Sequence, residues 1–106
     1  MNKKIDISDV KTEWLNQRAL VLISIFSVAA NKAGSHIIDL RADDVLKHIS
    51  TLAKNSNNAE LFSIYQRIKR EIRVSLSEAN ISIETGKEVD ELAIPITLSK
   101  RPNRYI

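Results

Sequence analysis

The clearest alternation of apolar and polar positions lies between residues 57 and 80. Asn57 and Asn58 are both suited to cap a helix, and Asn57 with Glu60 has the spacing of a capping box. Apolar side chains then recur at steps of three and four residues, which predicts a helix packed on a core over residues 58–78. The apolar stripe consists of Leu61, Ile64, Tyr65, Ile68, Ile72 and Leu76.

The first long helix is expected over residues 8–32. Ser8 is suited to cap it, and Gly34 can take the left-handed conformation that ends a helix. Its second half is apolar nearly all round, so it should lie in the middle of the fold. Four β-branched residues within 20–28 leave a strand open as the alternative there, although length and flanks favour the helix.

Two shorter elements are expected between these helices. Residues 36–40 follow a Gly-Ser turn and predict a brief strand. Residues 41–44 should begin the second helix, because their two carboxylates would stabilise its first turn. An apolar stripe continues that helix, and the asparagine-rich residues 55–58 favour a turn after it. The stripe consists of Val45, Leu46, Ile49, Leu52 and Ala53.

The C-terminal part of the chain changes to the period of a β-strand. Residues 81–84 alternate, a turn follows at 85–87, and residues 92–98 predict a second strand that completes a hairpin. Pro95 cannot donate to a ladder, so this strand should lie at an edge or carry a bulge. We expect a single domain over residues 8–98, a loosely attached N-terminal arm at 1–7 and a basic C-terminal tail at 99–106.

Composition narrows the class of protein. A chain of 106 residues with 43% hydrophobic and 27% charged residues is the size and type of one globular domain. The absence of cysteine excludes disulfides and thiolate metal sites and fits a cytoplasmic location. The apolar run at residues 19–30 falls short of the roughly 20 residues that span a bilayer, so no membrane partner is expected.

Enzyme signatures are not recognisable in this sequence. Its two glycines are too far apart to form a phosphate-binding loop, and no serine has the surroundings of a nucleophile. Asp44 and His48 are four residues apart, a spacing that more often gives a weak pair than a metal site. We therefore expect a non-enzymatic protein without a cofactor or a metal.

The order of the expected elements is helix, short strand, helix, turn, helix, strand, loop, strand. Over residues 10–98 this order resembles the winged helix-turn-helix domain, with 55–58 as the turn, 58–78 as the recognition helix and 81–98 as the wing. The resemblance implies an α+β fold of three helices, a short strand and a C-terminal hairpin. It further implies duplex DNA as the partner, bound as a homodimer, although winged helices also serve as protein–protein modules.

The residues beside the apolar stripe of helix 58–78 suit the reading of bases. Arginine donates in pairs to guanine or grips phosphate, and glutamine pairs with adenine. The alternative is an ordinary solvated face on which Glu71 and others form surface ion pairs. The candidate contacts on this helix are Ser63, Gln66, Arg67, Arg70 and Arg73, with Lys69 nearer the boundary of the stripe.

The C-terminal tail offers further positive charge. Lys100, Arg101 and Arg104 can neutralise phosphates and so add to the salt dependence of binding. The alternative is a solvated terminus with no ligand.

Negative charge in the predicted wing loop favours a different function. The loop has one lysine, Lys87, against four carboxylates, a net charge of −3, which does not suit contact with phosphates. The alternative function is a protein–protein interaction module that uses the apolar first helix and this acidic loop and binds no nucleic acid. The carboxylates belong to Glu84, Glu88, Asp90 and Glu91.

The first helix carries more apolar surface than a small domain needs to bury. Most of it should lie in the core, and part of it is expected to form a homodimer interface, as two-fold symmetric DNA-binding proteins require. The candidate residues are Trp14, Leu15, Leu22 and Phe26.

Overall fold

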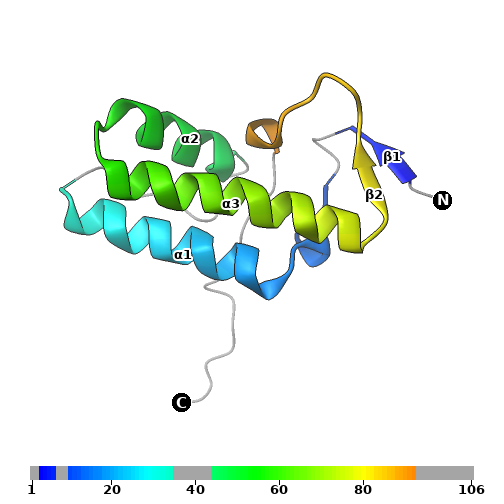
Figure 1. The fold of residues 1–106 in the computed structure, drawn as a ribbon, viewed down its shortest axis with the longest axis horizontal. Helices are drawn as coiled ribbons and strands as arrows, with labels where there is room; N and C mark the ends of the chain where they lie inside the picture. Colours follow the sequence, from blue (N-terminus) through cyan, green and yellow to red (C-terminus); the bar gives the residue numbers. More distant parts are fainter. Residues whose placement is uncertain (1–2, 7–9, 35–43, 93–106) are drawn as a thin grey trace, which may run out of the picture.

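The computed structural model describes residues 3–6, 10–34 and 44–92, and within these residues the fold is α+β and mostly helical (Figure 1). This confirms the expected α+β class and the three expected helices in the described part of the chain. In chain order the elements are β1 (Lys3–Ile5), η2 (Thr12–Trp14), α1 (Gln17–Lys32), α2 (Val45–Asn55), α3 (Ala59–Glu78), β2 (Ile81–Ile83) and η3 (Val89–Glu91).

The central element is α3, with α1 along one side and α2 along the other (Figure 1). α1 and α3 run antiparallel, since the backbone N–H of Asn16, just before α1, donates to Ser75 Oγ near the end of α3 at 2.9 Å. Every residue of the predicted apolar stripe of α3 is buried, as are Ile23 and Phe26 of α1. Each such side chain contributes about 1.5–3 kcal/mol through burial. The core therefore fixes which face of α3 remains open.

The start of α1 differs from the prediction. The helix begins at Gln17 rather than near residue 8, because the side chain of Asn16 caps it by accepting from the Ala19 N–H at 2.9 Å. The short helix η2 precedes it, and Ser8 lies outside the described residues. Residues 20–28 are helical, so the alternative of a strand is wrong. The end at Lys32 is as predicted, and Gly34 has a φ of +79°.

The turn between α2 and α3 has the expected asparagines. α2 begins at Val45 rather than at 41–44, and Asp44 stands at its N-cap without a capping hydrogen bond. Asn57 takes the left-handed conformation, with a φ of +59°. Asn58, rather than Asn57, caps α3, and its side chain accepts from the backbone N–H groups of Glu60 and Leu61. The helix boundaries predicted at 58–78 are confirmed to within one residue.

The sheet differs from the predicted C-terminal hairpin. β2 forms where a strand was expected, but it pairs in parallel with β1, with Lys3 opposite Ile81 and Ile5 opposite Ile83. The N-terminal arm thus contains a paired strand. Of the predicted second hairpin strand at 92–98, only Leu92 is described; it follows η3 and is buried. Residues 93–98 and the strand predicted at 36–40 lie outside the described residues.

Candidate nucleic-acid interface

The outer face of α3 is open to solvent along its length. Ser63, Gln66, Arg70 and Arg73 follow at steps of three and four residues, which places them on one face opposite the buried stripe. All four are exposed, as is Arg67 on the neighbouring row. The structure therefore brings together the five residues that the spacing selected. Lys69 is half-buried at the edge of this face, and its ammonium lies over the Tyr65 ring at 4.9 Å from the centroid.

Two arginines of this face have no ionic partner in the described part of the chain. Arg67 and Arg70 form no ion pair there, although Glu71 is four residues after Arg67. Glu71 instead faces Arg18 of α1 at 3.8 Å, a distance too long for a hydrogen bond. Its Oε1 atom is buried and accepts no hydrogen bond from the residues that the structure describes. The positive charges of Arg67 and Arg70 are thus not neutralised by a carboxylate of the described residues.

Arg73 is the exception, because it faces the acidic loop. Its guanidinium lies 3.9 Å from the carboxylate of Glu88, with both side chains more than half exposed. A pair of this kind is weak, typically about 0–1 kcal/mol. Loss of this ion pair would therefore cost little free energy.

One carboxylate of the acidic loop is held against the helices. The carboxylate of Asp90 accepts hydrogen bonds from Tyr65 Oη at 2.8 Å and from Ser50 Oγ at 3.1 Å, and it lies 3.8 Å from Lys54 Nζ. Lys87 faces Asp6, near β1, at 3.9 Å. Asp90 therefore connects η3 to both α2 and α3. Of the four loop carboxylates, that of Asp90 is thus engaged by the helices, whereas Glu84, Glu88 and Glu91 are exposed.

Phe62 is an exposed residue of this face that the sequence pattern did not select. Its side chain is 41% exposed, next to Ser63, and its ring lies 5.6 Å from that of Tyr65. The sequence does contain a signal for Phe62. It directly follows Leu61, which is in the apolar stripe, so its own aromatic side chain falls outside the stripe and should be exposed. Apolar side chains of this kind contact the methyl group of thymine in the major groove.

The predicted dimer residues lie mainly inside the chain. Leu15, Leu22 and Phe26 are buried in its own core, so they are not available at the surface to a second copy. Trp14 belongs to η2 rather than to α1; it is half-buried against the core, with Lys11 Nζ 5.7 Å from its ring. Of the four candidates, only Trp14 therefore keeps part of its side chain exposed.

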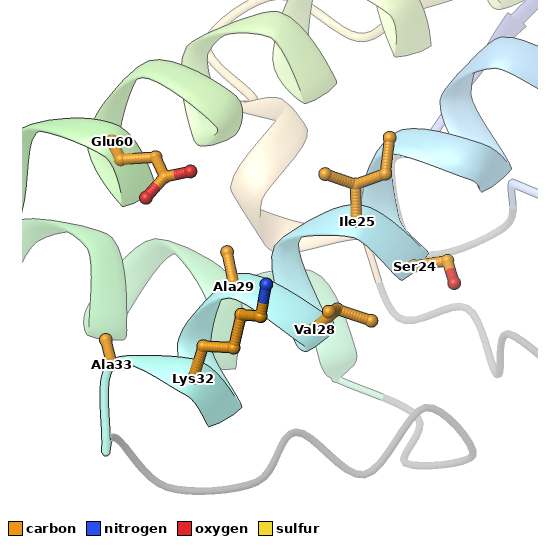
Figure 2. Close-up of a pocket in the computed structure, with 7 residues that line it drawn as sticks. All are labelled: Ser24, Ile25, Val28, Ala29, Lys32, Ala33 and Glu60. Carbon is orange, nitrogen blue, oxygen red and sulfur yellow. The ribbon is translucent and has the colours of Figure 1, made fainter.

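The exposed apolar residues of α1 are different ones, Val21, Ile25 and Val28. They line two adjoining hollows between α1 and α3, which share Ile25. Figure 2 shows the hollow towards the end of α1, with Lys32 on α1 and Glu60 on α3 both reaching into the space between the helices.

Other candidate features are weaker. His48 Nε2 lies 3.5 Å from Asp44, and both side chains are half exposed. Within residues 3–6, 10–34 and 44–92, no group of three or more side chains could hold a metal ion. Among the same residues, no helix is long and apolar enough to cross a membrane. Lys100, Arg101 and Arg104 lie outside the described residues, so their contribution stays a prediction.

Comparison with known proteins adds no assignment: no family model, curated protein or solved structure matches this chain.

Proposed function

We propose that this chain is a non-enzymatic protein that binds duplex DNA through the outer face of α3. The observation that carries the proposal is the pair of exposed arginines, Arg67 and Arg70, that the described residues leave without an ionic partner. Arginines left unpaired on a regular helix face suit contact with an anionic surface, because binding then breaks no internal ion pair.

The dimensions of α3 suit the major groove. A helix of 20 residues is about 30 Å long, and the major groove of about 12 Å admits one helix. Phe62, Ser63 and Gln66 lie in its first half, where base contacts usually occur in helix-turn-helix proteins. Arg70 and Arg73 follow on the same face, where they would contact phosphates. This division assigns sequence preference to the first half of α3 and affinity to the second.

The resemblance to the winged helix-turn-helix domain supports this assignment. α2, the asparagine-containing turn and α3 follow in the order that the family uses. The wing is the part of the resemblance with least support, since β2 pairs with β1 in the described residues. The proposal therefore rests on α3 and does not require a wing. A small transcriptional regulator in the cytoplasm is the role that suits such a protein.

A matched set of variants tests the proposal. Arg67→Gln, Arg70→Gln and Arg73→Gln together should abolish most binding to a labelled random-sequence duplex, measured by fluorescence anisotropy at low salt. The control replaces Lys11, Lys32 and Lys47 by glutamine, which removes the same charge from exposed positions outside α3. The control should retain most of the affinity. Equal losses in the two triple variants would mean that net charge, rather than α3, determines binding.

One observation favours a second candidate function. The exposed apolar residues Val21, Ile25 and Val28 are typical of a protein–protein contact. A protein interaction module that binds no nucleic acid would use this side of α1. Of the acidic loop, the exposed Glu84 and Glu91 would remain for such a contact, since Asp90 and Glu88 already face groups of α2 and α3. Unchanged anisotropy of the duplex at low salt would favour this candidate.

A further inference from the structure

Phe62 differs from the other large apolar side chains that are exposed. Four such side chains occur among the described residues, and three of them, Val21, Ile25 and Val28, belong to α1. Phe62 is the one on α3, in the half of the helix that the proposed function assigns to the bases. Apolar surface is stabilised when a ligand removes it from water, so this ring favours a ligand with an apolar group at the same place.

The ring of Phe62 is supported by a second aromatic ring. It lies 5.6 Å from the ring of Tyr65, with the two planes tilted by 55°. Tyr65 is itself buried and donates to the Asp90 carboxylate at 2.8 Å, which fixes its position. Aromatic pairs favour tilted arrangements of this kind. Phe62 therefore presents an ordered apolar surface to whatever contacts α3.

Gln66 lies beside Phe62 on the same row of α3, and both are exposed. The two residues are four positions apart, and Arg73 continues the row two turns further along. A separation of four residues corresponds to about 6 Å along the helix axis, and two base-pair steps of a DNA duplex span about 7 Å. Phe62 and Gln66 can therefore contact base pairs about two steps apart.

The first residues of α3 lack the side chains that recognise guanine. Arginine and lysine make the commonest guanine contact, and neither occurs within residues 59–66. Arg67, the first arginine of the helix, lines the hollow towards α1. Glu60 could accept from cytosine, but it reaches into the space between α1 and α3 (Figure 2). The open face beside Phe62 thus offers an apolar ring, the Ser63 hydroxyl and the Gln66 amide.

We propose that α3 reads A·T base pairs, with Phe62 against the methyl group of a thymine and Gln66 paired with an adenine. This preference rests on the proposed function and names the base pairs that the same site selects. The amide of Gln66 can donate to adenine N7 and accept from the N6 amino group, whereas guanine offers only acceptors in the major groove. Thymine alone among the four bases has a methyl group there. Ser63 can bond to either kind of base pair, so it adds no preference.

Three duplexes of equal length test this preference by fluorescence anisotropy. The first contains only A·T pairs in mixed order, the second has uracil in place of every thymine, and the third contains only G·C pairs. Uracil keeps every hydrogen-bonding group of thymine and lacks only the methyl group. The wild-type chain should bind the uracil duplex about fourfold more weakly than the thymine duplex, the effect of one buried methyl group. It should bind the G·C duplex more weakly still, because the pairing of Gln66 is lost as well.

Matched variants assign the methyl effect to Phe62. Phe62→Ala should bind the thymine and uracil duplexes equally. Ile25→Ala, which shortens an exposed apolar side chain of α1, should keep the fourfold difference. Gln66→Ala should also keep it, while losing part of the preference over the G·C duplex. All three variants should retain the salt dependence of binding, because none of them removes a charge.

Failure of this preference and failure of the proposed function are separate results. Absence of binding to all three duplexes at low salt would overturn both. Salt-dependent binding with equal wild-type affinity for the thymine and uracil duplexes would overturn the A·T preference alone. A methyl effect that survives Phe62→Ala would likewise overturn the assignment of Phe62 to thymine and leave duplex binding intact.

Discussion

Asn58 determines where α3 begins, and it is the residue on which the position of the outer face depends. Its Oδ1 atom accepts from the backbone N–H of Glu60 at 3.0 Å and of Leu61 at 3.2 Å. Asn57 before it is left-handed, which directs the chain from α2 into α3. Local chemistry of this kind acts within a few residues, which is why the start of α3 could be predicted from the sequence.

Replacement of this cap should lower stability. Asn58→Ala removes both accepted hydrogen bonds and should reduce the free energy of unfolding by about 1 kcal/mol, measured by urea denaturation. Asn55→Ala is the matched control, because Asn55 is exposed at the end of α2 and its side chain forms no hydrogen bond to the described residues. A larger loss for Asn55→Ala than for Asn58→Ala would contradict the assignment of the cap.

The hydrogen bond between Tyr65 and Asp90 should also be measurable. Tyr65→Phe keeps the buried ring but removes the donor to the Asp90 carboxylate, so the free energy of unfolding should fall by about 1–2 kcal/mol. Combining it with Asp90→Ala gives a double-mutant cycle that isolates the coupling of the two residues. Additive losses in the cycle would show that the pair contributes nothing specific. The sequence placed Asp90 in the predicted wing loop without a partner on a helix, because a contact across 25 residues leaves no local pattern.

Elements whose stabilising contacts lie within a few residues were predicted well from the sequence. Elements that depend on residues far away in the chain were not. α3 was predicted almost to the residue, since its apolar stripe and cap lie within the helix itself. The start of α1 was misplaced because Ser8 and Asn16 are both suited to cap, and only the packing of Asn16 against Ser75 selects between them. The faces of α1 were ambiguous for a related reason: apolar residues all round a helix give no periodicity that distinguishes the core from the surface.

The acidic loop and α3 are coupled through Glu88. Glu88→Gln releases Arg73 and should raise the affinity for duplex DNA, with a change in stability below about 0.5 kcal/mol because the pair is exposed. Glu91→Gln removes the same charge from the same loop, but Glu91 faces no cation among the described residues. The increase in affinity should therefore be larger for Glu88→Gln. Equal increases would indicate that only the net charge of the loop matters.

For the whole molecule, the pairing of β1 with β2 is the feature that sequence patterns could not supply. Lys3 and Ile81 are partners from opposite ends of the described chain, and β1 has only three residues. A parallel pair requires a long crossover, here made by all three α-helices. No periodicity identifies such a partner, so the nearest following strand was chosen and a hairpin was expected. The part of the candidate interface within the described residues did not depend on this choice, because it lies on α3.

The most direct test of the central claim is the affinity of the wild-type chain for a random-sequence duplex over a range of salt concentrations. If α3 contacts phosphates, the logarithm of the association constant should fall linearly with the logarithm of the salt concentration. Arg70→Gln should then make the slope shallower by about one, as expected for one lost phosphate contact. Absence of binding at low salt, or a slope that Arg70→Gln leaves unchanged, would contradict the assignment of α3 as a DNA-binding helix.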